Sequence, residues 1–223
     1  AMSDWSSDVC SSDLRYGGEA MAAMPSTGQL IYHMTSIDNL SSILKFGLLS
    51  RNHLLQNSNI QFTDIADPEI LSKRERYKKA LSQYVLFHFF AKNPFDGAVC
   101  RKYGSENMVI ITVWRSICIR NNYQIIPSHP LDSDTPDIYT YREGFKKVPW
   151  NILDDRAHRD YQNAEIRKAC MAECVVEDCV PVSDFAYIYV YSERAKEKIL
   201  RMENSAAIKD KIRVMPEMFP KGQ

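Results

Sequence analysis

Two short and almost unbroken apolar runs constrain the fold of this chain more than any other feature. Residues 84–90 read YVLFHFF and residues 109–114 read VIITVW. Both runs have the length of a strand and consist mainly of β-branched and aromatic residues, which suit central strands covered on both faces. Residues 185–191 predict a further strand. Helical patterns over residues 37–44 and 193–204 mix with these strands without regular alternation, so we predict an α+β fold with a largely antiparallel sheet.

Size and charge are those of an ordinary single-domain protein. The chain has 223 residues, of which 45% are hydrophobic, and this is enough to fill one core. We expect the domain to span residues 30–223, with residues 1–29 as a disordered or non-native tail rich in small and polar residues. The formal net charge is zero, so any nucleic-acid surface has to be local. No apolar run approaches the roughly 20 residues of a membrane span, and we expect a cytoplasmic protein.

The cysteines do not follow a pattern typical of disulfides or zinc sites. There are six, without a CxxC pair, and several lie within apolar segments where a reduced thiol behaves as a small hydrophobe. Cys170, Cys174 and Cys179 are close enough in sequence for a metal site to be an alternative. We predict free cysteines and no metal.

Glu173 marks a sharp change in the character of the chain. Before it, the charged pattern of residues 154–172 predicts a helix, and after it residues 174–176 predict a short buried strand. A carboxylate at this junction would lie at the mouth of the sheet and is a plausible catalytic group. The alternative is a surface glutamate that caps a strand.

The start of the domain forms a compact strand, histidine and helix unit. Residues 30–32 predict the first strand, His33 follows, and Thr35 or Ser36 can cap a helix that Gly47 ends.

A second helix is predicted where Asp67 and Pro68 supply a start signal. The helix carries the densest basic cluster of the chain, which reads as either a solvated face or a phosphate-binding surface. This cluster consists of Lys73, Arg74, Arg76, Lys78 and Lys79.

The remaining segments are less regular. We expect a short β-like piece at residues 60–62, turns over 91–107, a long functional loop over 128–141 and a weak last strand over 212–219.

Four segments, taken together and in this order, resemble the DarT family of ADP-ribosyltransferase toxins. They read IYHMTSIDNLSSILKFGLLS, DPEILSKR, YVLFHFF and MAECVVEDCVPVSDFAYIYVYSE, and together they extend over about residues 30 to 200. The resemblance implies an ADP-ribosyltransferase-like fold, with central, mainly antiparallel sheets flanked by helices. It also implies that NAD is consumed to attach ADP-ribose to a base of single-stranded DNA, and that a cognate antitoxin, an ADP-ribosyl hydrolase, exists as a partner.

The same resemblance implies roles for individual residues. His33 matches the histidine that holds a ribose hydroxyl of NAD, Arg74 matches an arginine that acts at the reacting ribose and phosphates, and Glu173 matches the catalytic glutamate. We also assign Thr35 and Tyr84 to the NAD site.

The DNA-binding residues form a second predicted group. We assign to it Arg76, Lys78, Lys79, Gln83 and His129. The aromatic side chains that we consider for stacking on bases are Tyr84, Phe87, Phe89 and Tyr139.

The segment KKALSQYVLFHFF stands where thymine-modifying members of the family carry a glycine-rich sequence with LeuHisAsp. This difference favours guanine as the modified base, with Gln83 pairing with the guanine edge. The alternatives are an enzyme of this fold that acts on RNA or protein, an enzyme similar to RNA 2′-phosphotransferases, and a non-catalytic binding module.

Removing charge at Arg76, Lys78 and Lys79 is expected to weaken DNA binding for all sequences and to flatten its salt dependence. Each phosphate contact that is lost removes roughly one released counterion from the slope. Fluorescence anisotropy with a labelled single strand at several salt concentrations measures that slope. An unchanged slope would mean that the cluster is a solvated helix face.

Overall fold

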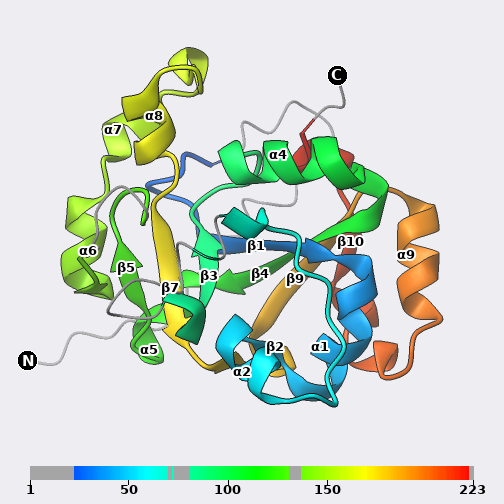
Figure 1. The fold of residues 1–223 in the computed structure, drawn as a ribbon. Helices are drawn as coiled ribbons and strands as arrows, with labels where there is room; N and C mark the ends of the chain where they lie inside the picture. The colour runs from blue at the N-terminus through cyan, green and yellow to red at the C-terminus, as the bar shows by residue number, and fades with distance from the viewer. Residues whose placement is uncertain (1–22, 70–71, 73–80, 131–136, 221–223) are drawn as a thin grey trace, which may run out of the picture.

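The computed structural model describes residues 23–69, 72, 81–130 and 137–220, and an eight-stranded sheet organises them (Figure 1). The strand order is β10-β9-β4-β1-β3-β7-β5-β6, and every neighbouring pair is antiparallel except β9 with β10. The strands are β1 Leu30–Ser36, β3 Tyr84–His88, β4 Met108–Trp114, β5 Gln124–Ile126, β6 Tyr139–Thr140, β7 Glu173–Glu177, β9 Phe185–Val190 and β10 Ile212–Val214. A separate pair joins β2 Leu48–Leu49 to β8 Cys179–Val180.

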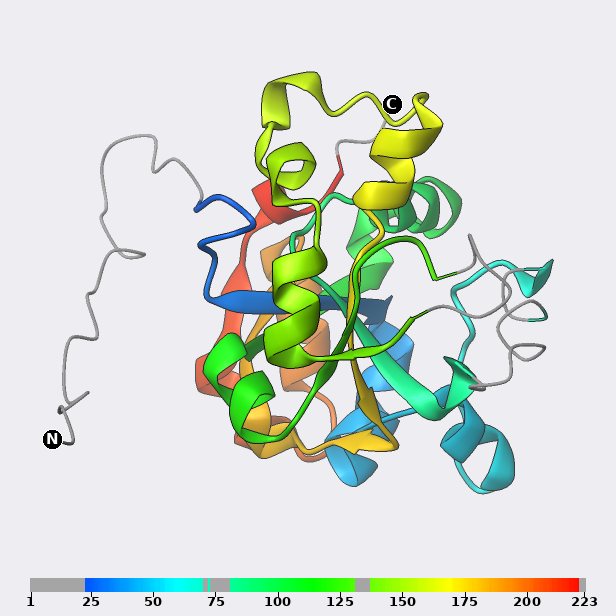
Figure 2. The ribbon, with the colours of Figure 1, turned by 90° about the vertical axis from the view of Figure 1, so that its left-hand side faces the viewer.

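Helices flank this sheet at both ends and on its faces. They are α1 Leu40–Phe46, α2 Arg51–Gln56, α4 Pro94–Tyr103, α5 Arg115–Arg120, α6 Tyr141–Lys147, α7 Trp150–Asp154, α8 Ala164–Ala169 and α9 Glu193–Leu200. In Figure 1, α6, α7 and α8 lie at the β5 end of the sheet and α9 lies at the β10 end. Figure 2 views the first of these ends. The prediction of a mainly antiparallel sheet flanked by helices is confirmed.

The two apolar runs form central strands, as predicted. β4 lies between β1 and β9, and its residues from Met108 to Val113 are all buried. β3 lies between β1 and β7. Gly47 ends α1 with a φ of 86°, a backbone conformation that glycine adopts without strain.

The helix predicted over residues 154–172 is wrong, because polar side chains interrupt it. α7 ends at Asp154, and α8 begins only at Ala164. Between them, Asp160 accepts a hydrogen bond from the backbone N–H of Gln162. Asn163 caps α8 by accepting from the N–H groups of two following residues. Such local bonds compete with helical ones, so the predicted segment contains only the last residue of α7, Asp154, and the short helix α8.

Residues 91–107 contain a helix where we expected turns. Asn93 accepts a hydrogen bond from the N–H of Asp96, and Pro94 occupies the first turn, so the proline starts α4. The β-like piece at residues 60–62 is also wrong, because no strand forms there. The weak last strand is confined to β10, after which a 3₁₀ helix begins at Pro216.

Arg115 joins the described part of the predicted tail to the sheet. Its guanidinium donates to the carbonyl oxygens of Pro25 at 2.7 Å and Leu30 at 3.2 Å, and lies over the ring of Phe89. The backbone N–H of Ser26 also donates to a carboxylate oxygen of Asp154 at 2.9 Å. Residues 23–29 thus contact the domain, residues 1–22 lie outside the described residues, and the boundary at residue 30 stays a prediction.

None of the helices in the part of the chain that the structure describes is both long and apolar enough to cross a bilayer.

Two glycines in helices provide a matched test of this packing. A Cβ at Gly144 of α6 would lie 2.6 Å from the Cβ of Ile125, whereas a Cβ at Gly97 of α4 meets only the end of Arg101 at 3.5 Å. Gly144→Ala is therefore expected to lower the free energy of unfolding by about 1–3 kcal/mol. Gly97→Ala is expected to raise it by up to about 1 kcal/mol, because alanine favours helix. Urea unfolding measures both changes, and equal effects would contradict the packing of α6 on β5.

Candidate active site

A cavity of about 210 Å³ opens where β1 and β3 separate. β1 pairs with β4 along its whole length, but its register with β3 contains the single pair Tyr32 and His88. Beyond that pair the two strands diverge, and residues from both strands line the space between them. Helix α1, residues 60–66 and the start of β7 complete the wall. The cavity is lined mainly by apolar groups and by a smaller number of polar side chains, as is typical of small-molecule sites.

Glu173 belongs to the wall of this cavity. It is the first residue of β7, and its neighbours in the register are His88 of β3 and Ile126 of β5. Only 1% of its surface is exposed, so the alternative of a surface glutamate is wrong. Residues directly opposite each other in an antiparallel pair share one face, which places Glu173 and His88 on the same side of the sheet. Both residues line the cavity.

His33 is held in one tautomer by the neighbouring strand. Its Nδ1 lies 2.7 Å from the carbonyl oxygen of Leu86. A carbonyl can only accept, so Nδ1 carries the hydrogen and the neutral ring presents Nε2 as an acceptor. Burial lowers the pKa of His33 from 6.5 to about 4, and the nearby His88 adds to the effect. The ring is therefore neutral at physiological pH and suited to accept a hydrogen bond from a hydroxyl.

Three other residues named from the sequence also line this cavity, namely Thr35, Tyr84 and His129. Thr35 is buried, and Asn39 donates to its hydroxyl at 3.1 Å. The Tyr84 hydroxyl donates to Glu177 at 3.3 Å, and partial burial raises its pKa. His129 is held by its backbone N–H, which donates to the carbonyl oxygen of Lys168 at 3.0 Å. The cavity thus contains His129, which we had assigned to DNA.

The other residues predicted to bind DNA or NAD are not part of the described cavity wall. The side chain of Gln83 is exposed, and Gln83 is absent from the cavity wall although Ser82 and Tyr84 are part of it. Arg74, Arg76, Lys78 and Lys79 lie outside the described residues.

The stacking role predicted for two of the aromatic residues is wrong. Phe87 is fully buried and Phe89 is 2% exposed, so both belong to the core and neither is accessible to a base. Tyr139 is half-buried but does not line the cavity, and its hydroxyl donates to Asp137. Of the residues considered for stacking, only Tyr84 lines the cavity.

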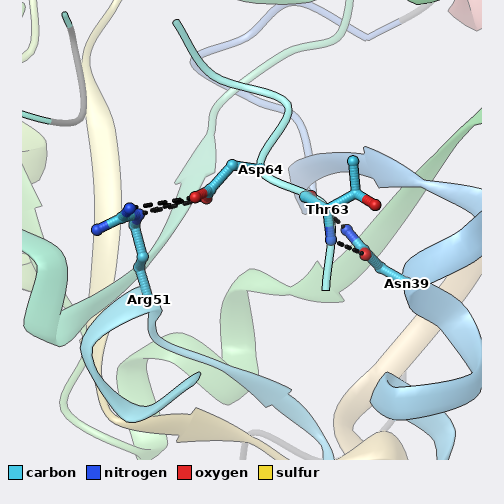
Figure 3. A network of polar contacts seen from close by, with 4 residues as sticks. All are labelled: Asn39, Arg51, Thr63 and Asp64. Atoms are coloured by element: carbon cyan, nitrogen blue, oxygen red, sulfur yellow. Dashed lines mark hydrogen bonds and ion pairs between the residues drawn. The ribbon is translucent and has the colours of Figure 1, made fainter. Parts of the chain in front are cut away.

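Sequence reasoning missed His88 and a polar network beside the cavity. His88 is 8% exposed and was read only as part of an apolar strand, although a lone polar residue in such a run is a signal. Figure 3 shows the network, in which Asn39 bonds to Thr63 and Arg51 pairs with Asp64. These pairs hold Thr63 and Asp64 in the cavity wall.

The described residues contain no group of three or more histidine, cysteine or acidic side chains that could hold a metal ion. Cys170 follows the last residue of α8, Cys174 lies in β7, and Cys179 lies in β8. Burial raises the pKa of all three thiols.

The family model described as DarT, ssDNA thymidine ADP-ribosyltransferase, matches residues 32–220. The chain belongs to the DarT family. A relative from Thermus sp. (strain 2.9), a DNA ADP-ribosyl transferase, is 27% identical over 195 residues, which cover 77% of this chain and 86% of the relative. A second relative is the DNA ADP-ribosyl transferase-DNA ADP-ribosyl glycohydrolase fusion protein of Thermosipho africanus (strain H17ap60334). It is 24% identical over 184 residues, covering 80% of this chain but only 46% of that relative.

Solved structures of DarT proteins share the fold. Thermus sp. 2.9 DarT in complex with ADP-ribosylated ssDNA has a TM-score of 0.72 at 22% identity, covering 86% of this chain and 96% of that chain. The same protein in complex with NAD+ has a TM-score of 0.68 at 21% identity, covering 87% and 98%. The predicted ADP-ribosyltransferase-like fold is confirmed.

His33→Gln is expected to flatten the pH dependence of stability. The unfolded chain binds a proton at His33 near pH 6.5, whereas the folded chain binds it only near pH 4. The free energy of unfolding should therefore fall as the pH drops through this window, by at most about 3 kcal/mol from this group. Urea unfolding of both proteins from pH 7 to pH 4 measures the difference. Parallel curves for the two proteins would contradict a neutral His33 whose pKa lies well below its usual value.

Proposed function

We propose that the protein transfers ADP-ribose from NAD to a base of single-stranded DNA and releases nicotinamide. The observation that carries this proposal is the cavity between β1 and β3, where a neutral His33 and the buried Glu173 lie together in the DarT fold. Two solved structures of one relative, Thermus sp. 2.9 DarT, are described as complexes with NAD+ and with ADP-ribosylated ssDNA, and they support the same choice of substrates.

In this proposal Glu173 and His33 have separate chemical roles. The bond between nicotinamide and the ribose C1′ breaks, and the ribose takes on oxocarbenium character. Glu173 stabilises that charge and accepts the proton that the base nitrogen loses as it bonds to C1′. His33 accepts a hydrogen bond from a ribose hydroxyl through Nε2. The largely apolar walls keep water from C1′, which limits hydrolysis of NAD.

The basic cluster of the sequence, which lies outside the described residues, is assigned to the phosphates of both substrates. We assign Arg74 to the NAD phosphates, since a guanidinium is a permanent, planar cation. Arg76, Lys78 and Lys79 are assigned to the DNA backbone. Tyr84 is placed at the NAD site or against a base, because its ring lies at the cavity wall. A single strand is the expected substrate because extruding a base from a duplex costs a few kcal/mol.

For the base itself we propose guanine, although the family model carries the name of a thymidine enzyme. The exposed Gln83 is the last residue of the 3₁₀ turn Leu81–Gln83 and lies between Ser82 and Tyr84 of the cavity wall, and its amide can pair with both acceptors and donors of guanine. We assign His129 to DNA because it lines the same cavity as Ser82 and Tyr84, the neighbours of Gln83.

A cellular role as a toxin follows from the proposed reaction. The fused ADP-ribosyl glycohydrolase of the Thermosipho relative supports a partner that removes the modification. We therefore propose a toxin-antitoxin pair in the cytoplasm, with an ADP-ribosyl hydrolase as the antitoxin.

Labelled NAD, incubated with single-stranded DNA, RNA or protein in parallel, tests the proposed reaction. We expect label on DNA only, and mass spectrometry of the digested nucleosides should identify ADP-ribosyl-deoxyguanosine. ADP-ribosyl-thymidine would overturn the choice of base but keep the reaction class, and label on RNA or protein alone would overturn the substrate. Gln83→Ala should relax the base preference without abolishing transfer.

Glu173→Gln is the matched variant for the catalytic role. The substitution keeps the shape of the side chain and removes its charge, so transfer should fall at least about 100-fold, the lower end of general acid-base contributions. Its melting temperature should equal or exceed that of the wild type, because a buried charge is removed. Transfer at a near wild-type rate would exclude Glu173 as the catalytic glutamate.

A further inference from the structure

Asn39 connects two parts of the cavity wall that lie far apart in sequence, the end of β1 at Thr35 and the segment around Thr63. It follows β1 in the 3₁₀ helix Ile37–Asn39, and its side chain is 8% exposed. Its Oδ1 accepts from the backbone N–H of Thr63 at 2.7 Å, and its Nδ2 donates to the carbonyl oxygen of Thr63 at 3.0 Å. The same Nδ2 donates to the hydroxyl of Thr35 at 3.1 Å. Figure 3 shows the paired bonds to Thr63.

The partners determine how the Asn39 amide is oriented. The N–H of Thr63 can only donate and its carbonyl can only accept, so the oxygen and nitrogen of the amide are assigned without ambiguity. Both hydrogens of Nδ2 are used, one on Thr63 and one on Thr35. The side chain thus pairs with the backbone of Thr63 as a neighbouring strand would.

This pairing matters because residues 60–66 are irregular. No strand or helix holds them, yet they form one wall of the cavity. Asp64, which follows Thr63, is held by an ion pair with Arg51, whose Nη2 lies 3.1 Å from an Asp64 carboxylate oxygen. Residues 63 and 64 are therefore fixed from two sides, by α2 and by the start of α1.

The bond to Thr35 has a consequence for ligand binding. A hydroxyl that accepts a hydrogen bond still carries its own hydrogen. Because Asn39 donates to Thr35, the lining hydroxyl of Thr35 is set to act as a donor toward an acceptor in the cavity. His33, two residues earlier, presents the opposite polarity through Nε2. The cavity wall thus offers one oriented acceptor and one oriented donor.

We propose that Asn39 is a positioning residue for NAD, which presets both the wall at Thr63 and the donor at Thr35 before the dinucleotide binds. This inference rests on the proposed function and deepens it. Preorganisation of this kind lowers the entropic cost of binding, so its loss appears in affinity more than in the chemical step.

Steady-state transfer with NAD as the varied substrate tests this role. Asn39→Ala should raise KM for NAD by about 10-fold, with kcat within about twofold, as expected when bonds that order the binding site are lost. Asn57→Ala is the matched control. Asn57 follows α2 and precedes the irregular segment, its side chain accepts from the N–H of Asn59 at 3.3 Å, and it does not line the cavity. Its KM should stay at the wild-type value.

Two further measurements separate positioning from a loss of structure. In a Thr35→Val background, the effect of Asn39→Ala on KM should shrink, because part of it acts through the Thr35 hydroxyl. Amide exchange of Thr63 should accelerate in Asn39→Ala but not in Asn57→Ala. If Asn39→Ala does not fold, Asn39→Asp carries the test, since it keeps an acceptor for the Thr63 N–H and loses both donated bonds.

The outcomes distinguish the inference from the function on which it rests. A wild-type protein that neither binds NAD nor transfers ADP-ribose overturns the proposed function. A wild-type enzyme with normal transfer, together with an Asn39 variant whose KM equals that of Asn57→Ala, overturns the positioning role alone. A fall in kcat at unchanged KM would also contradict it.

Discussion

The separation of β1 from β3 is the constraint on which the rest of the site depends. β1 is tied to β4 along its whole length and β3 is tied to β7, but the two strands share one register pair, Tyr32 with His88. A sheet that splits in this way leaves backbone groups without ladder partners, and these must be satisfied otherwise. One solution is visible across the split, where His33 donates to the carbonyl oxygen of Leu86. The cavity and the orientation of its histidine therefore have the same origin.

The buried carboxylate of Glu173 beside that split lowers the stability of the fold but is needed for the proposed reaction. Taking Glu173 out of water is costly unless neighbouring groups compensate, and a scaffold selected for stability alone would place an apolar residue there. The sheet accommodates this cost because β3 and β5 hold the start of β7 from both sides. Rigid strands carry the groups assigned to chemistry, and an irregular segment held by side-chain bonds carries part of the wall. This division is typical of sites that need fixed geometry together with ligand access.

The sequence predicted the elements that depend on local pattern and missed those that depend on distant partners. The apolar runs identified β3 and β4, and the start of the domain and Glu173 led to residues that the fold brings to one cavity. The roles of these residues remain predictions. The break between α7 and α8 was missed because helical charge patterning hides the local bonds of Asp160 and Asn163. Asn39 was missed because its partner, Thr63, lies in a segment without any periodic signal.

In the proposed reaction, the ribose of NAD that loses nicotinamide lies between His33 and Glu173 in the split of the sheet. A crystal structure of the Glu173→Gln variant with NAD would show whether it does. We expect a ribose hydroxyl within hydrogen-bonding distance of His33 Nε2, and C1′ beside the amide of residue 173. A dinucleotide bound elsewhere, with this cavity empty, would mean that the split of the sheet is not the NAD site.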